Sequence, residues 1–152
     1  MPFNKTMDEF NTTYMIKDKK FNSGNLNTMG DLIGDELVEF DGEFENLPIV
    51  KENFVKEAID ILYITSQQLR LMGVDVDAAF AEVHRSNMSK ALPLDGSINV
   101  QKELEKVRER YPNAGVKEGQ RYAVLICGDT QKVIKPEGCY SPAIITKEMV
   151  GE

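Results

Sequence analysis

The chain has 152 residues, of which 41% are hydrophobic and 28% charged, a balance typical of one globular domain and not of a disordered chain. Its net charge of −7 argues against a protein that wraps a nucleic acid polymer, because the overall field repels phosphates. No apolar run is long enough to span a membrane, and the first residues lack the apolar stretch of a secretory signal. Two cysteines without a CxxC pair favour a reducing compartment. We therefore expect a cytoplasmic protein.

Apolar residues at three- and four-residue steps predict helices along the first half of the chain. One lies around residues 7–15, and the Asn- and Gly-rich stretch 22–30 after it is expected to be a loop. The next two helices cover residues 31–46 and 51–72. The second of these is apolar nearly all round, which predicts a central position in the fold.

A further helix is predicted after Gly73, with Asp75 or Asp77 as its cap, and it runs toward Ala91. Short loops join the last three helices, so we expect an antiparallel helical bundle. The whole chain is interpreted as one domain with a core at about residues 7–92.

The remaining part, about residues 93–142, has a different character and is interpreted as a small C-terminal elaboration. A short helix is predicted before Pro112, and residues 113–120 are expected to be a loop. The β-prone run 122–127 can pair with residues 131–134 as a hairpin.

Two pairs of acidic residues stand on the predicted central helices. Glu36 and Glu39 are three residues apart, as are Glu57 and Asp60, so each pair lies on one helix face. If the helices pack antiparallel, the four carboxylates converge, and their mutual repulsion needs compensation. Because no Lys or Arg occurs between Phe21 and Val50, we expect a hard cation such as Mg²⁺.

Other interpretations of these residues stay open. An ExxE pair on an amphipathic helix is usually a solvated face, so a non-catalytic helical interaction module is an alternative. A di-iron site is disfavoured, because the only histidine, His84, has no Glu three residues before it. Asn87 and Lys90 are helical neighbours, and Lys90 can meet phosphate oxygens as a point charge. A polar helix end with a cation favoured by the helix dipole explains the same residues without a ligand.

The two acidic pairs, followed by a helix that ends Val-His-Arg-Ser-Asn-Met-Ser-Lys, resemble the MazG-like all-α nucleoside triphosphate pyrophosphohydrolases. Within them the chain looks closest to the phosphoribosyl-ATP-pyrophosphohydrolase-like branch, which includes members encoded by bacteriophages. The resemblance covers about residues 7–92, with a weaker echo from Lys132 to Pro142. It implies an all-α core with a small C-terminal extension that holds a helix and a possible β-hairpin.

The resemblance also implies an activity and a site. Family members hydrolyse a nucleoside triphosphate to the monophosphate and pyrophosphate with Mg²⁺ or Mn²⁺. By position the metal ligands are Glu36, Glu39, Glu57 and Asp60, and Glu36 or Glu39 also orients or deprotonates the attacking water. The substrate contacts implied in the same way are Asn87, Lys90, Lys135, Tyr140 and Asn11.

The substrate and the assembly are expected from the same resemblance. A deoxynucleotide such as dGTP fits control of a nucleotide pool in the host cytoplasm if the chain is phage-encoded. Phosphoribosyl-ATP is the alternative substrate. Family members are homodimers or homotetramers in which helical hairpins pair into four-helix cores. Residues 95–131 depart from the family pattern, and the alternatives for them are a part in the base pocket, a part in the oligomer interface, or simple surface elaboration.

Overall fold

The computed structural model describes residues 2–152 and divides the chain into two compact units. The first unit comprises the residues up to 79 together with 145–152, and the second comprises residues 80–144. The boundary falls inside one helix, ahead of the elaboration expected from residue 93. Across the described residues, no helix combines the length and apolar character that a membrane crossing requires.

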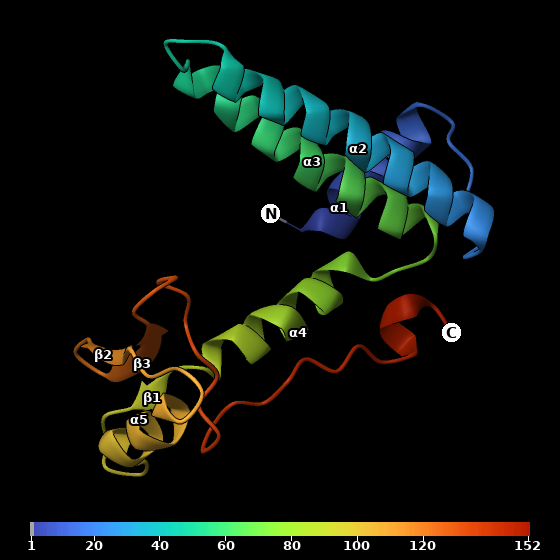
Figure 1. Ribbon diagram of the computed structural model, residues 1–152. Coiled ribbons are helices and arrows are strands. Elements are labelled where there is room, and N and C mark those ends of the chain that lie inside the picture. The colour runs from blue at the N-terminus through green and yellow to red at the C-terminus, as the bar shows by residue number, and fades with distance from the viewer. Residues whose placement is uncertain (1) are drawn as a thin grey trace. The chain divides into compact units, whose positions relative to one another are not determined.

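The first unit is built on a helical hairpin (Figure 1). Helix α2 (Ser23–Glu45) and helix α3 (Lys51–Leu71) pack against each other along their length, and the short helix α1 (Phe3–Thr13) packs on α3. The chain turns back between α2 and α3 within a few residues, so the two long helices run antiparallel. This arrangement confirms the predicted all-α core.

Helix α2 begins well before the predicted start. Residues 22–30 were expected to be a loop, but the helix starts at Ser23 because the side chain of Asn22 accepts a hydrogen bond from the Asn25 N–H at 3.0 Å. This cap compensates for the glycines in the first turns, which weaken a helix by about 1 kcal/mol each relative to alanine. Gly73 ends α3 as predicted, with a φ of +87° that favours glycine.

The N-termini of α1 and α4 (Val76–Met88) share their capping groups. Asp75 caps its own helix by accepting the Ala78 N–H at 2.9 Å. Asp77 instead accepts the N–H groups of Phe3 and Asn4, at 2.7 and 3.2 Å. The Asn4 side chain accepts the Val76 N–H at 2.9 Å. Each helix start therefore satisfies backbone donors of the other.

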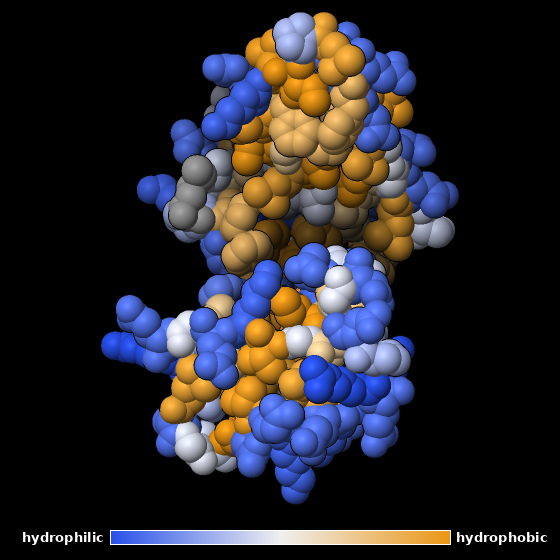
Figure 2. All heavy atoms as spheres, turned by 60° about the vertical axis from the view of Figure 1, so that its left-hand side comes forward, coloured by the Kyte–Doolittle hydropathy of each residue, from blue (hydrophilic) through white to orange (hydrophobic). Residues whose placement is uncertain are grey.

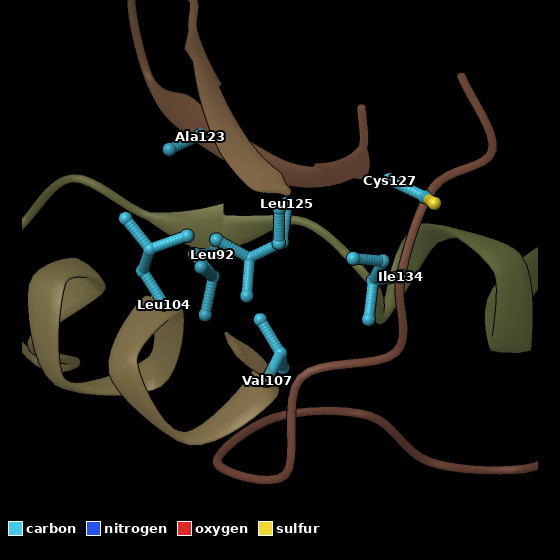
Figure 3. Close-up of a cluster of buried hydrophobic side chains, with 8 residues drawn as sticks. Leu92, Leu104, Val107, Ala123, Leu125, Cys127 and Ile134 are labelled. Atoms are coloured by element: carbon cyan, nitrogen blue, oxygen red, sulfur yellow. The ribbon is translucent and has the colours of Figure 1, made fainter. Parts of the chain in front are cut away.

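The second unit contains a three-stranded antiparallel sheet with strand order β1-β3-β2. Its strands are β1 (Leu92–Pro93), β2 (Ala114–Glu118) and β3 (Tyr122–Cys127), and helix α5 (Val100–Arg108) packs against it. Apolar side chains from α5, from the sheet and from Ile134 form one buried cluster (Figure 3). The alternating burial of β3 fits a strand with one face on this core.

The predicted hairpin is present, with an additional strand. Residues 131–134 pair with β3 through an Ile126–Val133 bridge and an Ile134 N–H to Leu125 C=O bond of 2.7 Å. The expectation of a loop over residues 113–120 is wrong, because β2 occupies most of that stretch and pairs along β3 from Ala114–Cys127 to Glu118–Ala123.

The shared caps generate a stability prediction. We expect Asp77→Ala to lower the free energy of unfolding by about 1–2 kcal/mol, because two backbone N–H groups of α1 lose their acceptor. Chemical denaturation followed by circular dichroism measures the change. Asp77→Asn keeps one acceptor oxygen and should lose less. Equal stability of Asp77→Ala and the unmodified protein would contradict the capping role.

Candidate functional site

Carboxylates from the packed helices α2 and α3 converge on one another. Glu36, Glu39 and Glu57 each offer an oxygen, and these oxygens lie within 4.8 Å of one another. Glu57 is 8% exposed, whereas Glu39 faces solvent. The sequence spacing thus brings together three of the four predicted metal ligands. Asp60 is not part of this group, although it lines the same cavity as Glu36.

Lys56 is the counter-charge that the sequence survey missed. Its ammonium donates to both Glu57 oxygens, at 3.0 and 3.1 Å, and forms an ion pair with Asp60 at 2.9 Å. These contacts raise the pKa of Lys56, first through the hydrogen bond to Asp60 and then through that to Glu57. The absence of Lys and Arg was noted only between Phe21 and Val50, and Lys56 lies outside that segment, on α3. The signal was the i,i+4 spacing of Lys56 and Asp60.

Glu36 carries the clearest electrostatic signature among the acids. Burial raises its pKa, and the negative charges of Glu39 and Asp60 raise it further, while Lys56 opposes the effect. Like charges at this separation disfavour full ionisation of the cluster.

The donor set fits a hard divalent cation. It consists of carboxylate oxygens alone, which Mg²⁺ and Mn²⁺ prefer, and it contains no thiolate or imidazole that would favour zinc. A cation would offset the negative charge that Lys56 only partly balances. Glu36, Glu39 and Glu57 would hold such an ion, with Asp60 at the side of the same cavity.

A cavity of about 410 Å³ adjoins the carboxylates within the first unit. Glu36 and Asp60 lie on its wall together with apolar and aromatic side chains of all three helices. The rings of Phe10 and Tyr63 meet edge-on, with centroids 5.5 Å apart. The cavity thus combines an acidic side, an aromatic side and, from Gln67 and Gln68, hydrogen-bonding amides. Such a mixture is typical of a small-molecule site.

Asn11 belongs to a buried amide chain. Lys19 donates to Gln68 at 2.9 Å, Gln68 donates to Gln67 at 2.8 Å, and Gln67 donates to the Asn11 side-chain oxygen at 3.2 Å. Asn11 itself lines a neighbouring cavity of about 540 Å³, not the one with the carboxylates. The consecutive polar residues Gln67 and Gln68 inside an otherwise apolar helix were the sequence signal for this network.

The other predicted contacts gather in the second unit. Lys90 donates to the Asn87 side chain at 2.6 Å, and the Lys135 ammonium lies 4.9 Å from the centre of the Tyr140 ring. Hydrogen bonds to Ser86 and Lys135 lower the pKa of the Tyr140 hydroxyl, and the charges of Lys135 and Lys90 lower it further. The structure thus forms a Lys90–Asn87 pair and a Lys135–Tyr140 pair. The charge of Lys90 acts on Tyr140, which also bonds to Ser86, a residue that the sequence analysis did not single out.

Comparison with known families agrees with this geometry. The phosphoribosyl-ATP pyrophosphohydrolase family matches residues 3–87, more than half of the chain, and includes all four predicted metal ligands. The chain belongs to this family and is a hydrolase that acts on phosphoric anhydrides, a pyrophosphohydrolase of the nucleotide type. No curated protein matches the chain. The matched range ends before Lys90 and excludes most of the second unit.

The position of Lys56 generates a prediction about metal and stability. Lys56→Met removes the cation that offsets Glu57 and Asp60, so we expect a lower melting temperature in EDTA than for the unmodified protein. Mg²⁺ should then raise the melting temperature of the variant by a larger increment than that of the unmodified protein. Differential scanning calorimetry with and without Mg²⁺ measures both increments. Lys51→Met, on the same helix but outside the ion pairs, is the control, and equal increments for all three proteins would contradict the competition.

Proposed function

We propose that the chain hydrolyses a nucleoside triphosphate to the nucleoside monophosphate and pyrophosphate with Mg²⁺ or Mn²⁺. The observation that carries this proposal is the convergence of Glu36, Glu39 and Glu57 beside a cavity with aromatic and amide walls. Membership of a pyrophosphohydrolase family supports the reaction class. A solvated acidic face is a weaker interpretation, because Glu57 is buried and still faces two other acids.

The roles of the acids follow from their positions. A bound divalent cation would neutralise charge on the triphosphate and would lower the pKa of a bound water molecule. Glu36, Glu39 and Glu57 would hold the ion, and Asp60, beside them on the wall of the cavity, would complete the set. Glu36 or Glu39 would orient the attacking water and accept its proton. The water oxygen bonds to phosphorus, the α–β anhydride bond breaks, and pyrophosphate leaves. An acidic protein can thus bind a polyanion, because cations lie between them.

The cavity beside Glu36 suits the nucleoside part of the substrate. Phe10 and Tyr63 offer ring faces and edges against which a base can pack. The amides of Gln67 and Gln68 carry both donors and acceptors, as recognition of a base edge requires. We assign a purine deoxynucleotide such as dGTP as the substrate to be tested first.

Within the second unit, the remaining predicted contacts form a group that suits phosphate oxygens. Asn87, Lys90, Lys135 and Tyr140 supply two ammonium groups, an amide and a hydroxyl, all of which suit phosphate oxygens. Asn11 contributes by holding Gln67 in place.

Phosphoribosyl-ATP is the second candidate substrate, because the matching family is named for its hydrolysis. The chemistry at the anhydride is the same. The additional phosphoribosyl group needs more room around the base than a deoxynucleotide does.

The α2–α3 hairpin supports assembly into a homodimer or homotetramer. Neither helix is covered on all sides, and α2 has no fully buried side chain. Val55, Ile59 and Leu62 recur on one face of α3 and are 48%, 53% and 42% exposed. Figure 2 shows hydrophobic atoms gathered over the end of this hairpin, at the top of the view. A second copy of the same apolar face is the partner that we propose, in a four-helix core.

The proposed reaction predicts a metal-dependent turnover. With Mg²⁺ we expect pyrophosphate release from at least one member of a panel of ribo- and deoxyribonucleoside triphosphates and phosphoribosyl-ATP, and none with EDTA. Glu39→Gln and Asp60→Asn should each lower turnover by roughly a hundredfold or more, because a cation ligand is lost. A coupled pyrophosphate assay measures the rates.

The controls for this assay separate folding from chemistry. Circular dichroism of both variants should keep the helical signal of the unmodified protein. Glu45→Gln, an exposed acid at the end of the same helix α2, should keep its turnover. Unchanged turnover in both Glu39→Gln and Asp60→Asn would contradict the metal assignment. The triphosphate that is hydrolysed fastest decides between a nucleoside triphosphate and phosphoribosyl-ATP.

The proposed assembly predicts a change of mass. We expect the double substitution Val55→Glu and Leu62→Glu to convert the assembly to monomer, because charges would be buried in the apolar interface. Sedimentation velocity measures the mass. Val83→Glu, at a residue 44% exposed on α4, is the matched control and should leave the mass unchanged. A monomer for the unmodified protein would exclude the assembly.

A further inference from the structure

The charge of the chain is divided unevenly between its two units. Residues 80–144 carry ten Lys and Arg against eight Asp and Glu, a net charge of +2. The rest of the chain carries eight Lys and Arg against 17 Asp and Glu, a net charge of −9. The second unit therefore has a positive net charge although the whole chain is acidic. Anion binding to this unit need not depend on a bridging metal.

A cavity of about 400 Å³ in the second unit concentrates this positive charge. Its wall carries one carboxylate, that of Glu137, and four cationic side chains, those of Lys106, Arg110, Lys132 and Lys135. The Tyr111 ring and the apolar side chains of Val107 and Ile134 also line it. The cavity is formed largely by the elaboration, outside residues 3–87 that match the family.

The cations stand on segments that the core holds in place. Val107 on α5 and Ile134 on the segment after β3 are both buried in the hydrophobic cluster (Figure 3). The Ile134 N–H donates to Leu125 at 2.7 Å, and the Lys132 C=O accepts from Cys127 at 2.9 Å. Lys132 and Arg110 thus extend from backbone that packing and hydrogen bonds hold at the cavity.

Some of the cations that line this cavity form no ion pair with a carboxylate. Lys106 is neutralised by Glu103, at 2.7 Å, and lies 3.7 Å from Glu137. Within residues 2–152, neither Arg110 nor Lys132 has a carboxylate at ion-pair distance, whereas Arg110 lies 5.5 Å from the centre of the Tyr111 ring. Lys135 contacts the Tyr140 ring. Two to three positive charges therefore face the cavity without an acidic partner.

We propose that this cavity is a metal-independent binding site for the phosphate group of a small phosphorylated molecule. Arg110 and Lys132 bind the phosphate oxygens, Arg110 through its planar guanidinium and Lys132 as a point charge. Val107, Ile134 and Tyr111 give the organic part of the ligand an apolar wall. A long nucleic acid is a poorer fit, because Glu105 on α5 and Glu109 just after it interrupt the cations and leave no continuous basic stripe.

The test uses the full chain in EDTA, where the acidic site of the first unit has no cation to attract an anion. The probes are inorganic pyrophosphate, adenosine monophosphate and, as the uncharged control, adenosine. We expect both anions to bind, with an affinity that falls as salt rises, and adenosine not to bind. Amide chemical shifts in two-dimensional NMR should change at residues 106–111 and 132–135.

Two double variants distinguish binding in this cavity from non-specific attraction of anions to the positively charged unit. Arg110→Gln with Lys132→Gln should weaken binding of both anions about tenfold or more. Lys102→Gln with Lys117→Gln removes the same charge elsewhere in the unit and should leave the affinity within about twofold. Lys135 stays unchanged, because the proposed function already assigns it to the substrate. A melting temperature within a few degrees confirms that each variant is folded.

The outcomes separate the sources of the phosphate and the rival explanations. Equal affinity for pyrophosphate and adenosine monophosphate supports a site for the phosphate alone, and tighter adenosine monophosphate binding supports a phosphate ester. The proposal is overturned by no binding in EDTA, by equal loss in both double variants, or by adenosine binding as tightly as its monophosphate. Tighter binding of a single-stranded oligonucleotide that both variants weaken would assign the surface to a polymer. Because no step requires turnover, failure of the pyrophosphohydrolase proposal leaves this result unaffected.

Discussion

The repulsion between acids on two facing helices is the constraint on which the first unit depends. Packing α2 against α3 brings Glu36, Glu39 and Glu57 within 4.8 Å of one another. Two full charges about 4 Å apart repel by roughly 4 kcal/mol at an effective dielectric constant of about 20. A group that offsets this charge therefore stabilises the helical hairpin. Lys56 does so for Glu57 and Asp60 but contacts neither acid of α2. A helix pair selected for stability alone would not keep this conflict.

The two units differ in the sign of their net charge, and therefore in how each acts on an anion. The net charge of the first unit is −9 and repels an anion, whereas that of the second unit is +2 and attracts one. The family match covers the acidic helices and stops near the end of α4. The helix and sheet that follow are thus an addition with its own core, and that core places the cations of the second unit.

Much of the fold could be predicted from local pattern, and the failures are places where distant contacts decide. The i,i+3 spacing of the acids predicted their shared face, because helix geometry is local. Residues 114–118 were missed because Gly115 and the charged pair Lys117–Glu118 lack strand character, and β2 forms through pairing with β3. The start of α2 depended on one cap at Asn22. In the site, Lys56 was not predicted because the lack of cations between Phe21 and Val50 says nothing of α3, where Lys56 stands one turn before Asp60.

The amide chain beside the cavity shows how one charge can preset hydrogen bonding for a ligand. An ammonium has donors only, so Lys19 requires the oxygen of Gln68 to face it. The Gln68 amide nitrogen must then face Gln67, and the Gln67 nitrogen must face Asn11. Both glutamines are thereby fixed in one of their two orientations. Each keeps one donor hydrogen and one acceptor lone pair unused. The positions of these remaining groups are therefore set by Lys19, a residue on a loop outside the three helices.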